Sequence, residues 1–127
     1  MRVAIMENNH SNLMSLISLI HKLLPEAMVT GFTNGNDALH WCEDHASDID
    51  LFLGNWWGSD ELVCGPEGAN IARLVIWEKQ PKIILYAGEE MFRKWSMREG
   101  ANAFLLRPIT TTTLREALET LDIKTIY

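Results

Sequence analysis

The sequence predicts a doubly wound α/β domain, in which helices cover both faces of a five-stranded parallel sheet. Short apolar runs alternate with amphipathic helical patterns from one end of the chain to the other, and glycine or proline stands at most of the joins. The 127 residues, 47% of them hydrophobic, suit one compact domain. Because strands and helices alternate strictly, we expect parallel strands joined by right-handed crossovers.

The first two strands and two helices lie within the first 45 residues. Residues 3–6 are typical of a buried strand, and apolar residues then recur at helical spacing until Pro25 stops the helix. Residues 28–32 predict the second strand, and a polar turn follows in which Asn36 is expected to cap the second helix. The apolar positions of these helices are Leu13, Leu16, Ile17, Ile20, Leu23, Leu24, Ala38, Leu39 and Cys42.

The middle of the chain contains the third strand, predicted over residues 49–53. Residues 54–68 are rich in glycine and contain two adjacent tryptophans, which predicts a long loop. A helix over about residues 69–78 and the fourth strand, residues 82–86, follow it. The apolar positions of that helix are Ile71, Leu74, Val75 and Trp77.

The last part of the chain supplies a helix that ends at Gly100, a strand over residues 103–106, and a helix capped by Thr110. Apolar residues at helical spacing support both helices. They are Met91, Phe92, Trp95 and Met97 in the first, and Leu114, Ala117, Leu118 and Leu121 in the second.

Composition excludes several classes of function. A net charge of −6 and the lack of a basic run make direct nucleic-acid binding unfavourable. No apolar stretch approaches the roughly 20 residues of a membrane span, so we expect a cytoplasmic protein. Two cysteines without metal-ligand spacing predict neither a disulfide framework nor a zinc site.

Five segments at characteristic spacing resemble the receiver domains of two-component response regulators. They are residues 2–8, 35–39, 50–55, 81–87 and 100–108, the last reading Gly-Ala-Asn-Ala-Phe-Leu-Leu-Arg-Pro. The resemblance implies a flavodoxin-like fold with strand order 2-1-3-4-5 and five helices, and a regulatory role in bacterial signalling or transcription control. Residues 1–122 are interpreted as the receiver-like domain, and residues 123–127 as a tail or the start of a linker.

The resemblance also implies a phosphoacceptor pocket, but this chain departs from the family at each reactive position. Asn55 matches the nucleophilic aspartate, Glu7 and Asn8 match the acidic metal-binding pair, Tyr86 matches a small hydroxyl residue, and Arg107 matches a lysine. An amide cannot form an acyl phosphate by the usual attack, and one carboxylate is a poor magnesium site. We expect Arg107 to pair with Glu7 in a self-satisfied polar plug, without metal, cofactor or enzymatic activity.

Function is therefore expected to rest on protein contacts. Phe104 matches the family's switch aromatic, and the fourth helix, fifth strand and fifth helix match its usual interaction face, so a protein partner or a homodimer is expected there. The candidate contact residues are Met91, Arg93, Lys94, Trp56 and Trp57.

The tryptophan pair has other interpretations. Trp56 and Trp57 could pack against their own loop, or edge a crevice for a small molecule or a flavin, which is the alternative function. Against a flavin, residues 7–11 lack the glycine, serine and threonine run whose amides would hold a phosphate. Asp60 and Glu61 would supply acidic groups only if the loop folded back to the pocket.

Overall fold

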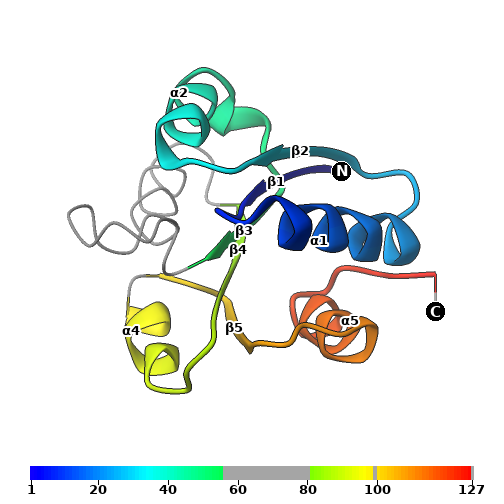
Figure 1. Cartoon of the computed structure of the whole chain (residues 1–127). Coiled ribbons are helices and arrows are strands. Elements are labelled where there is room, and N and C mark those ends of the chain that lie inside the picture. Colours follow the sequence, from blue (N-terminus) through cyan, green and yellow to red (C-terminus); the bar gives the residue numbers. More distant parts are fainter. Residues whose placement is uncertain (56–80, 99, 127) are drawn as a thin grey trace.

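The computed structural model describes residues 1–55, 81–98 and 100–126, and it contains a five-stranded parallel sheet in the order β2-β1-β3-β4-β5 (Figure 1). The predicted fold class and strand order are therefore confirmed. The strands are β1 (Arg2–Met6), β2 (Met28–Phe32), β3 (Leu51–Asn55), β4 (Lys82–Ala87) and β5 (Ala103–Leu106). The helices are α1 (His10–Leu23), α2 (Gly35–His45), the short 3-10 helix η1 (Ala46–Asp48), α4 (Phe92–Arg98) and α5 (Thr111–Thr120). The helix predicted over residues 69–78 lies outside the described residues.

Helices cover both faces of the sheet, as Figure 1 shows: α1 and α5 lie on one side, and α2 and α4 on the other. Alternate residues of each strand point to opposite faces, which divides the core into two apolar clusters. On the α1/α5 side the strands contribute Val3, Ile5, Leu51, Leu53, Ile84, Tyr86 and Leu105. On the α2/α4 side they contribute Ala4, Met6, Phe52, Ile83, Leu85, Ala87 and Phe104.

Helix caps agree with the sequence at α5 and differ at α2. Thr110 caps α5 as predicted, in a capping box: the Thr113 amide donates to Thr110 Oγ1, and the Thr110 amide donates to Thr113 Oγ1. The predicted cap of α2, Asn36, was wrong, because this residue lies inside the helix. Asn34 takes that role, and its Oδ1 accepts from the Asp37 amide at 2.9 Å. Either asparagine fits the cap preference, and the turn geometry selects the earlier one.

One further boundary, that of β3, and the burial of apolar residues in α4 differ from prediction. β3 runs over Leu51–Asn55, two residues later than expected, although Ile49 is still fully buried. In α4, Phe92 and Ser96 form the buried face, while Trp95 and Met97 are 44% and 46% exposed; Met91, predicted within this helix, lies just before it and is 56% exposed. A seven-residue helix has room for only one short inward stripe, so the other apolar residues remain on the surface.

Gly31 gives side chains of α1 room to pack closely on β2. A Cβ at Gly31 would lie 2.8 Å from a Leu13 methyl carbon and 3.3 Å from one of Ile17. The absent side chain therefore lets the helix approach the edge strand.

The end of the chain returns to α1. The Ile123 amide bonds the Leu118 carbonyl at 2.9 Å, and the Ile126 amide bonds the Leu23 carbonyl at 3.1 Å. Residues 123–126, predicted as a tail or a linker, thus run from the end of α5 to the end of α1. Among the described residues, no helix combines the length and the apolar character that crossing a bilayer requires.

Candidate functional site

The predicted pocket residues meet at the carboxyl ends of four adjacent strands. Glu7 follows β1, Asn55 ends β3, Tyr86 lies near the end of β4, and Arg107 follows β5. Each stands two positions after a residue of the α1/α5 cluster, namely Ile5, Leu53, Ile84 and Leu105. Strand alternation therefore directs all four side chains to the same side of the sheet.

Glu7 is the centre of the arrangement. Glu7 is 0% exposed, and its Oε1 accepts hydrogen bonds from the Tyr86 hydroxyl at 2.9 Å and from Arg107 Nη2 at 2.5 Å. Its Oε2 accepts from the Asn9 backbone amide at 2.8 Å. A buried carboxylate is tolerated when it is paired and hydrogen-bonded, and both oxygens of Glu7 meet that condition. The ion pair expected between Glu7 and Arg107 is present.

Asn55 joins the same group through its amide. Its Nδ2 donates to the Asn8 side-chain oxygen at 2.9 Å and makes a longer contact, 3.5 Å, with Glu7 Oε1. The residue is 3% exposed. The position that the resemblance assigns to a nucleophile therefore carries a buried amide that acts as a hydrogen-bond donor.

Tyr86 is paired with Asn55 of β3 in the sheet. Its ring is 1% exposed, and the Arg107 guanidinium carbon lies 5.3 Å from the ring centroid. Burial raises the pKa of Tyr86 well above its ordinary value, and the Glu7 charge raises it further. The phenol is therefore a neutral donor toward Glu7 at physiological pH. We call Glu7, Asn55, Tyr86 and Arg107 the polar plug.

The polar plug does not fit the divalent ion that receiver chemistry implies. Glu7 is the single carboxylate of the plug, and Arg107 balances its charge. Magnesium favours several anionic or carbonyl oxygens in octahedral geometry. Within residues 1–55, 81–98 and 100–126, no three His, Cys, Asp or Glu side chains gather in a way that could hold a metal ion.

Asn9 was not singled out from the sequence, yet it serves both the plug and the helix. Its backbone amide bonds Glu7, and its side-chain oxygen caps α1 by accepting from the Asn12 amide at 2.9 Å. An asparagine directly before a helical pattern is a usual cap, so this second role was readable from the sequence. The Arg107–Pro108 peptide bond, next to the plug, is cis.

The predicted contact residues lie partly on the face formed by α4, β5 and α5. Phe104 is 6% exposed, and the Arg93 guanidinium carbon lies 5.0 Å from its ring centroid. Arg93 also pairs with Glu90, while Met91 and Lys94 are exposed. A shallow hollow of about 550 Å³ crosses this face, and Arg93, Met97, Phe104, Leu106, Thr113 and Glu116 are among its lining residues.

The remaining candidates fall in the stretch between β3 and β4. Trp56 and Trp57, together with Asp60 and Glu61, lie outside the described residues. The structure therefore brings together Glu7, Asn8, Asn55, Tyr86 and Arg107. It separately brings Arg93 onto Phe104 on the α4–β5–α5 face, while Lys94 is exposed on α4 and Met91 is exposed just before it.

Comparison with known proteins gives similarity in structure but not in sequence. No protein-family model matches the chain, and no curated protein matches it in sequence. Among solved structures, a response regulator receiver protein from Burkholderia phymatum superposes with a TM-score of 0.78 at 15% identity, over 99% of this chain and 98% of that chain. A receiver domain protein from Clostridium thermocellum gives 0.76 at 16% identity, over 95% and 94% of the two chains.

A chemotaxis protein from Vibrio cholerae is also similar, with a TM-score of 0.72 at 16% identity over 93% of this chain and 95% of that chain. These values cover nearly the whole length of each protein, so the similarity extends beyond a shared βαβ unit. At identities of 15–16%, this structural similarity establishes the fold alone, and the chemistry of the chain must be argued from its site. The chain adopts the fold of response-regulator receiver domains.

Proposed function

We propose that this chain is a cytoplasmic, receiver-like regulatory module of bacterial signalling or transcription control, which is not phosphorylated at the usual position and acts through protein contacts. The observation that carries the proposal is the polar plug. A carboxylate, an arginine, a tyrosine and an amide satisfy one another where a receiver would hold a nucleophile and a metal ion.

The first support concerns the nucleophile. Attack on a phosphorus centre requires an anionic oxygen, and the amide of Asn55 has neither the charge nor the basicity for it. Its Nδ2 donates a hydrogen bond to Asn8, which fixes the orientation of the neutral amide group. Glu7 is the remaining carboxylate of the plug, and Arg107 and Tyr86 both donate to its Oε1.

The second support concerns charge and space. Developing negative charge on a phosphoryl group needs a metal ion or a free cation close by. Here the cation, Arg107, pairs with Glu7, and the buried ring of Tyr86 occupies the place that the resemblance gives to a small hydroxyl. Without that hydroxyl, Phe104 lacks the partner that would couple it to phosphorylation.

The α4–β5–α5 face supports the second half of the proposal, which is function through contacts. Met97 and Leu106, which line the hollow on this face together with Arg93, are 46% and 39% exposed, and Lys94 is exposed on the same helix as Met97. Methionine and arginine are enriched at protein interfaces, and large exposed apolar residues that lie together often mark an interaction site. We propose that a protein partner or a second copy of this chain binds this face.

Phosphorylation tests the first half. The protein is incubated with acetyl phosphate and Mg²⁺, and its intact mass is measured beside a receiver domain that keeps its aspartate. We expect no phosphoryl adduct on this chain. An adduct would contradict the proposal, and its loss in Asp60→Asn would place the reactive group in the stretch between β3 and β4.

Charge reversal tests the second half. Lys94→Glu on α4 is compared with Lys22→Glu on α1, because both lysines are exposed and they lie on opposite sides of the sheet (Figure 1). Self-association is measured by light scattering, and partner binding by capture from the native lysate. Loss of binding in Lys94→Glu alone is expected, while equal binding by both variants would refute a role for this face.

A further inference from the structure

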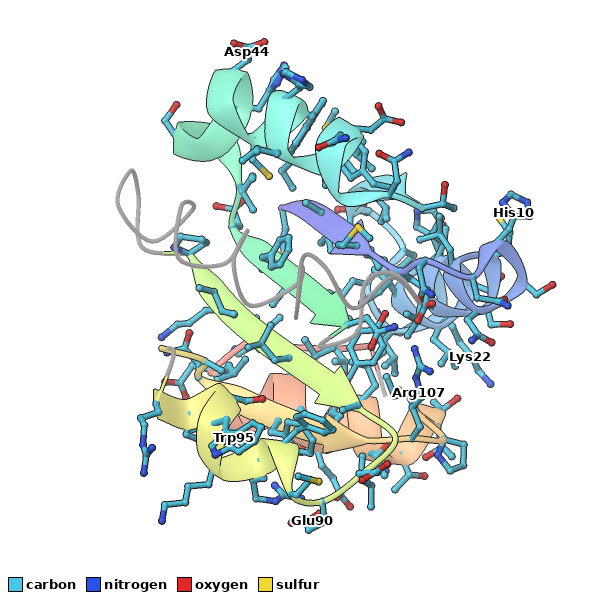
Figure 2. All side chains as sticks on the ribbon, turned by 60° about the vertical axis from the view of Figure 1, so that its left-hand side comes forward. His10, Lys22, Asp44, Glu90, Trp95 and Arg107 are labelled. Carbon is cyan, nitrogen blue, oxygen red and sulfur yellow. The ribbon has the colours of Figure 1, made fainter. Side chains whose placement is uncertain are left out.

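A hollow of about 400 Å³ lies beside the polar plug, between α1 and the turn that joins β5 to α5. Glu7 and Tyr86 contribute to its lining, so it adjoins the plug directly. Figure 2 shows Arg107 between the ribbon of α1 and the end of β5. The hollow is thus distinct from the α4–β5–α5 face, which lies on another side of β5.

Its walls are mainly apolar. Leu16 is 4% exposed, and Leu19 and Ile109 are half-buried. Asn12 and Ser15, both exposed, add an amide and a hydroxyl at the rim. A few polar groups around an apolar wall, in a volume within the usual range of about 300–1,000 Å³, are typical of small-molecule sites.

Arg107 determines which charge the hollow accepts. Its side chain is 35% exposed, and its ion pair with Glu7 engages Nη2. A guanidinium carries five N–H donors in a planar fork, more than one carboxylate oxygen can take. Glu7 also lines the hollow, but 1% of its side chain is exposed against 35% of Arg107, so a ligand there meets more of the cation's surface than of the anion's.

The ion pair also limits what charge alone can contribute. Glu7 already offsets the positive charge of Arg107, so a small anion gains little Coulomb energy there. Contact with Leu16, Leu19 and Ile109 must then supply much of the binding energy. A ligand that combines one carboxylate with an apolar body satisfies both parts of the wall.

We propose that this hollow binds an amphipathic monocarboxylate, whose carboxylate contacts Arg107 and whose apolar part lies along Leu16, Leu19 and Ile109. The inference concerns binding only. It holds whether or not the chain acts through the α4–β5–α5 face.

Titration of the ¹⁵N-labelled protein with octanoate, followed by NMR, tests the ligand class. Octan-1-ol carries the chain without the charge, and acetate the charge without the chain. We expect octanoate to bind at least about tenfold more tightly than either, with shifts concentrated in α1 and around Arg107. Equal binding of octanol or acetate would overturn the proposal, as would shifts centred on Ile123 and Ile126, which line a second hollow.

Paired substitutions test the place. Ser15→Trp puts a large ring at the rim, whereas Ser18→Trp, on the same helix and also exposed, does not line the hollow. We expect about a tenfold loss of octanoate affinity in Ser15→Trp and none in Ser18→Trp. Arg107→Lys keeps the charge but not the fork, and should weaken binding severalfold. Unchanged affinity in both Ser15→Trp and Arg107→Lys, each checked for folding by circular dichroism, would refute the site.

Discussion

The ion pair between Arg107 and Glu7 offers the most informative perturbation of the polar plug. Arg107→Gln removes the cation and leaves Glu7 fully buried. The Tyr86 hydroxyl and the Asn9 amide would remain as donors, with the longer contact from Asn55 Nδ2. We expect the variant to be less stable, because a buried carboxylate loses its counter-charge.

The size of the loss follows from burial. Removing one member of a fully buried ion pair costs roughly 3–5 kcal/mol, while an exposed pair contributes about 0–1 kcal/mol. Glu7 belongs to the first case with 1% exposure of its side chain, but Arg107 is 35% exposed, so water screens the pair in part. We therefore expect Arg107→Gln to lower the free energy of unfolding by about 2 kcal/mol.

A double-mutant cycle separates the pair from other effects of the substitution. Glu7→Gln alone should cost about 1 kcal/mol, since Arg107 is partly exposed to water and tolerates the loss of its partner better than the buried Glu7 does. In the Glu7→Gln background, Arg107→Gln should cost little, which gives a coupling energy of about 2 kcal/mol. Urea unfolding followed by circular dichroism measures each value, and an unchanged m-value shows that the native state is intact.

Arg115→Gln is the matched control. Arg115 is 34% exposed and its nearest contact with Glu119 is 3.9 Å, but Glu119 is 56% exposed, so the expected change is below about 0.5 kcal/mol. If Arg107→Gln cost no more than Arg115→Gln, or cost the same with and without Glu7, the plug would not be held together by this ion pair.

Three further predictions concern single residues. Because the pKa of Tyr86 is raised in the folded protein, its neutral form contributes stability that is fully present below about pH 10 and is lost as pH rises toward the folded pKa. In urea unfolding at pH 9 to 11, the free energy of unfolding should therefore fall less steeply with pH for Tyr86→Phe than for wild type. Burial raises the pKa of Cys42 to about 11, so in a Cys64→Ser background iodoacetamide at pH 8 should alkylate the native protein at least about tenfold more slowly than the unfolded one; equal rates would contradict its burial. Thr110→Ala should cost about 1 kcal/mol in thermal unfolding, and no change would mean that the capping box is not a net stabiliser.

The sheet and its helices could be predicted because the apolar residues of each segment follow either strand or helix spacing, and a capping or helix-stopping residue marks where a segment begins or ends. Pro25 and Thr110 mark the end of one helix and the start of another, and α5 buries Leu114 and Leu118 as its spacing indicates. Boundaries failed where two residues were equally suitable. Asn34 and Asn36 both fit a cap, and only the turn geometry distinguishes them.

The polar plug was predictable for a related reason. The carboxyl ends of parallel strands lie at the same edge of the sheet. Glu7 after β1 and Arg107 after β5 therefore pair there, although β3 and β4 lie between these two strands. The hollow beside Arg107 was not predictable, because Leu19 and Ile109 become neighbours only when α1 packs beside the β5–α5 turn. Exposure on α4 was likewise a matter of tertiary packing, since the apolar spacing of Trp95 does not show that its side chain stays exposed while Phe92 is buried.

A crystal structure of the protein grown with beryllofluoride and Mg²⁺ tests the central claim most directly. We predict that neither ion is ordered at the ends of β1 and β3, and that Arg107 and Tyr86 still donate to Glu7. Ordered beryllofluoride beside Asn55, with Mg²⁺ held by Glu7 and Arg107 displaced, would contradict the claim that the plug replaces the phosphoacceptor site.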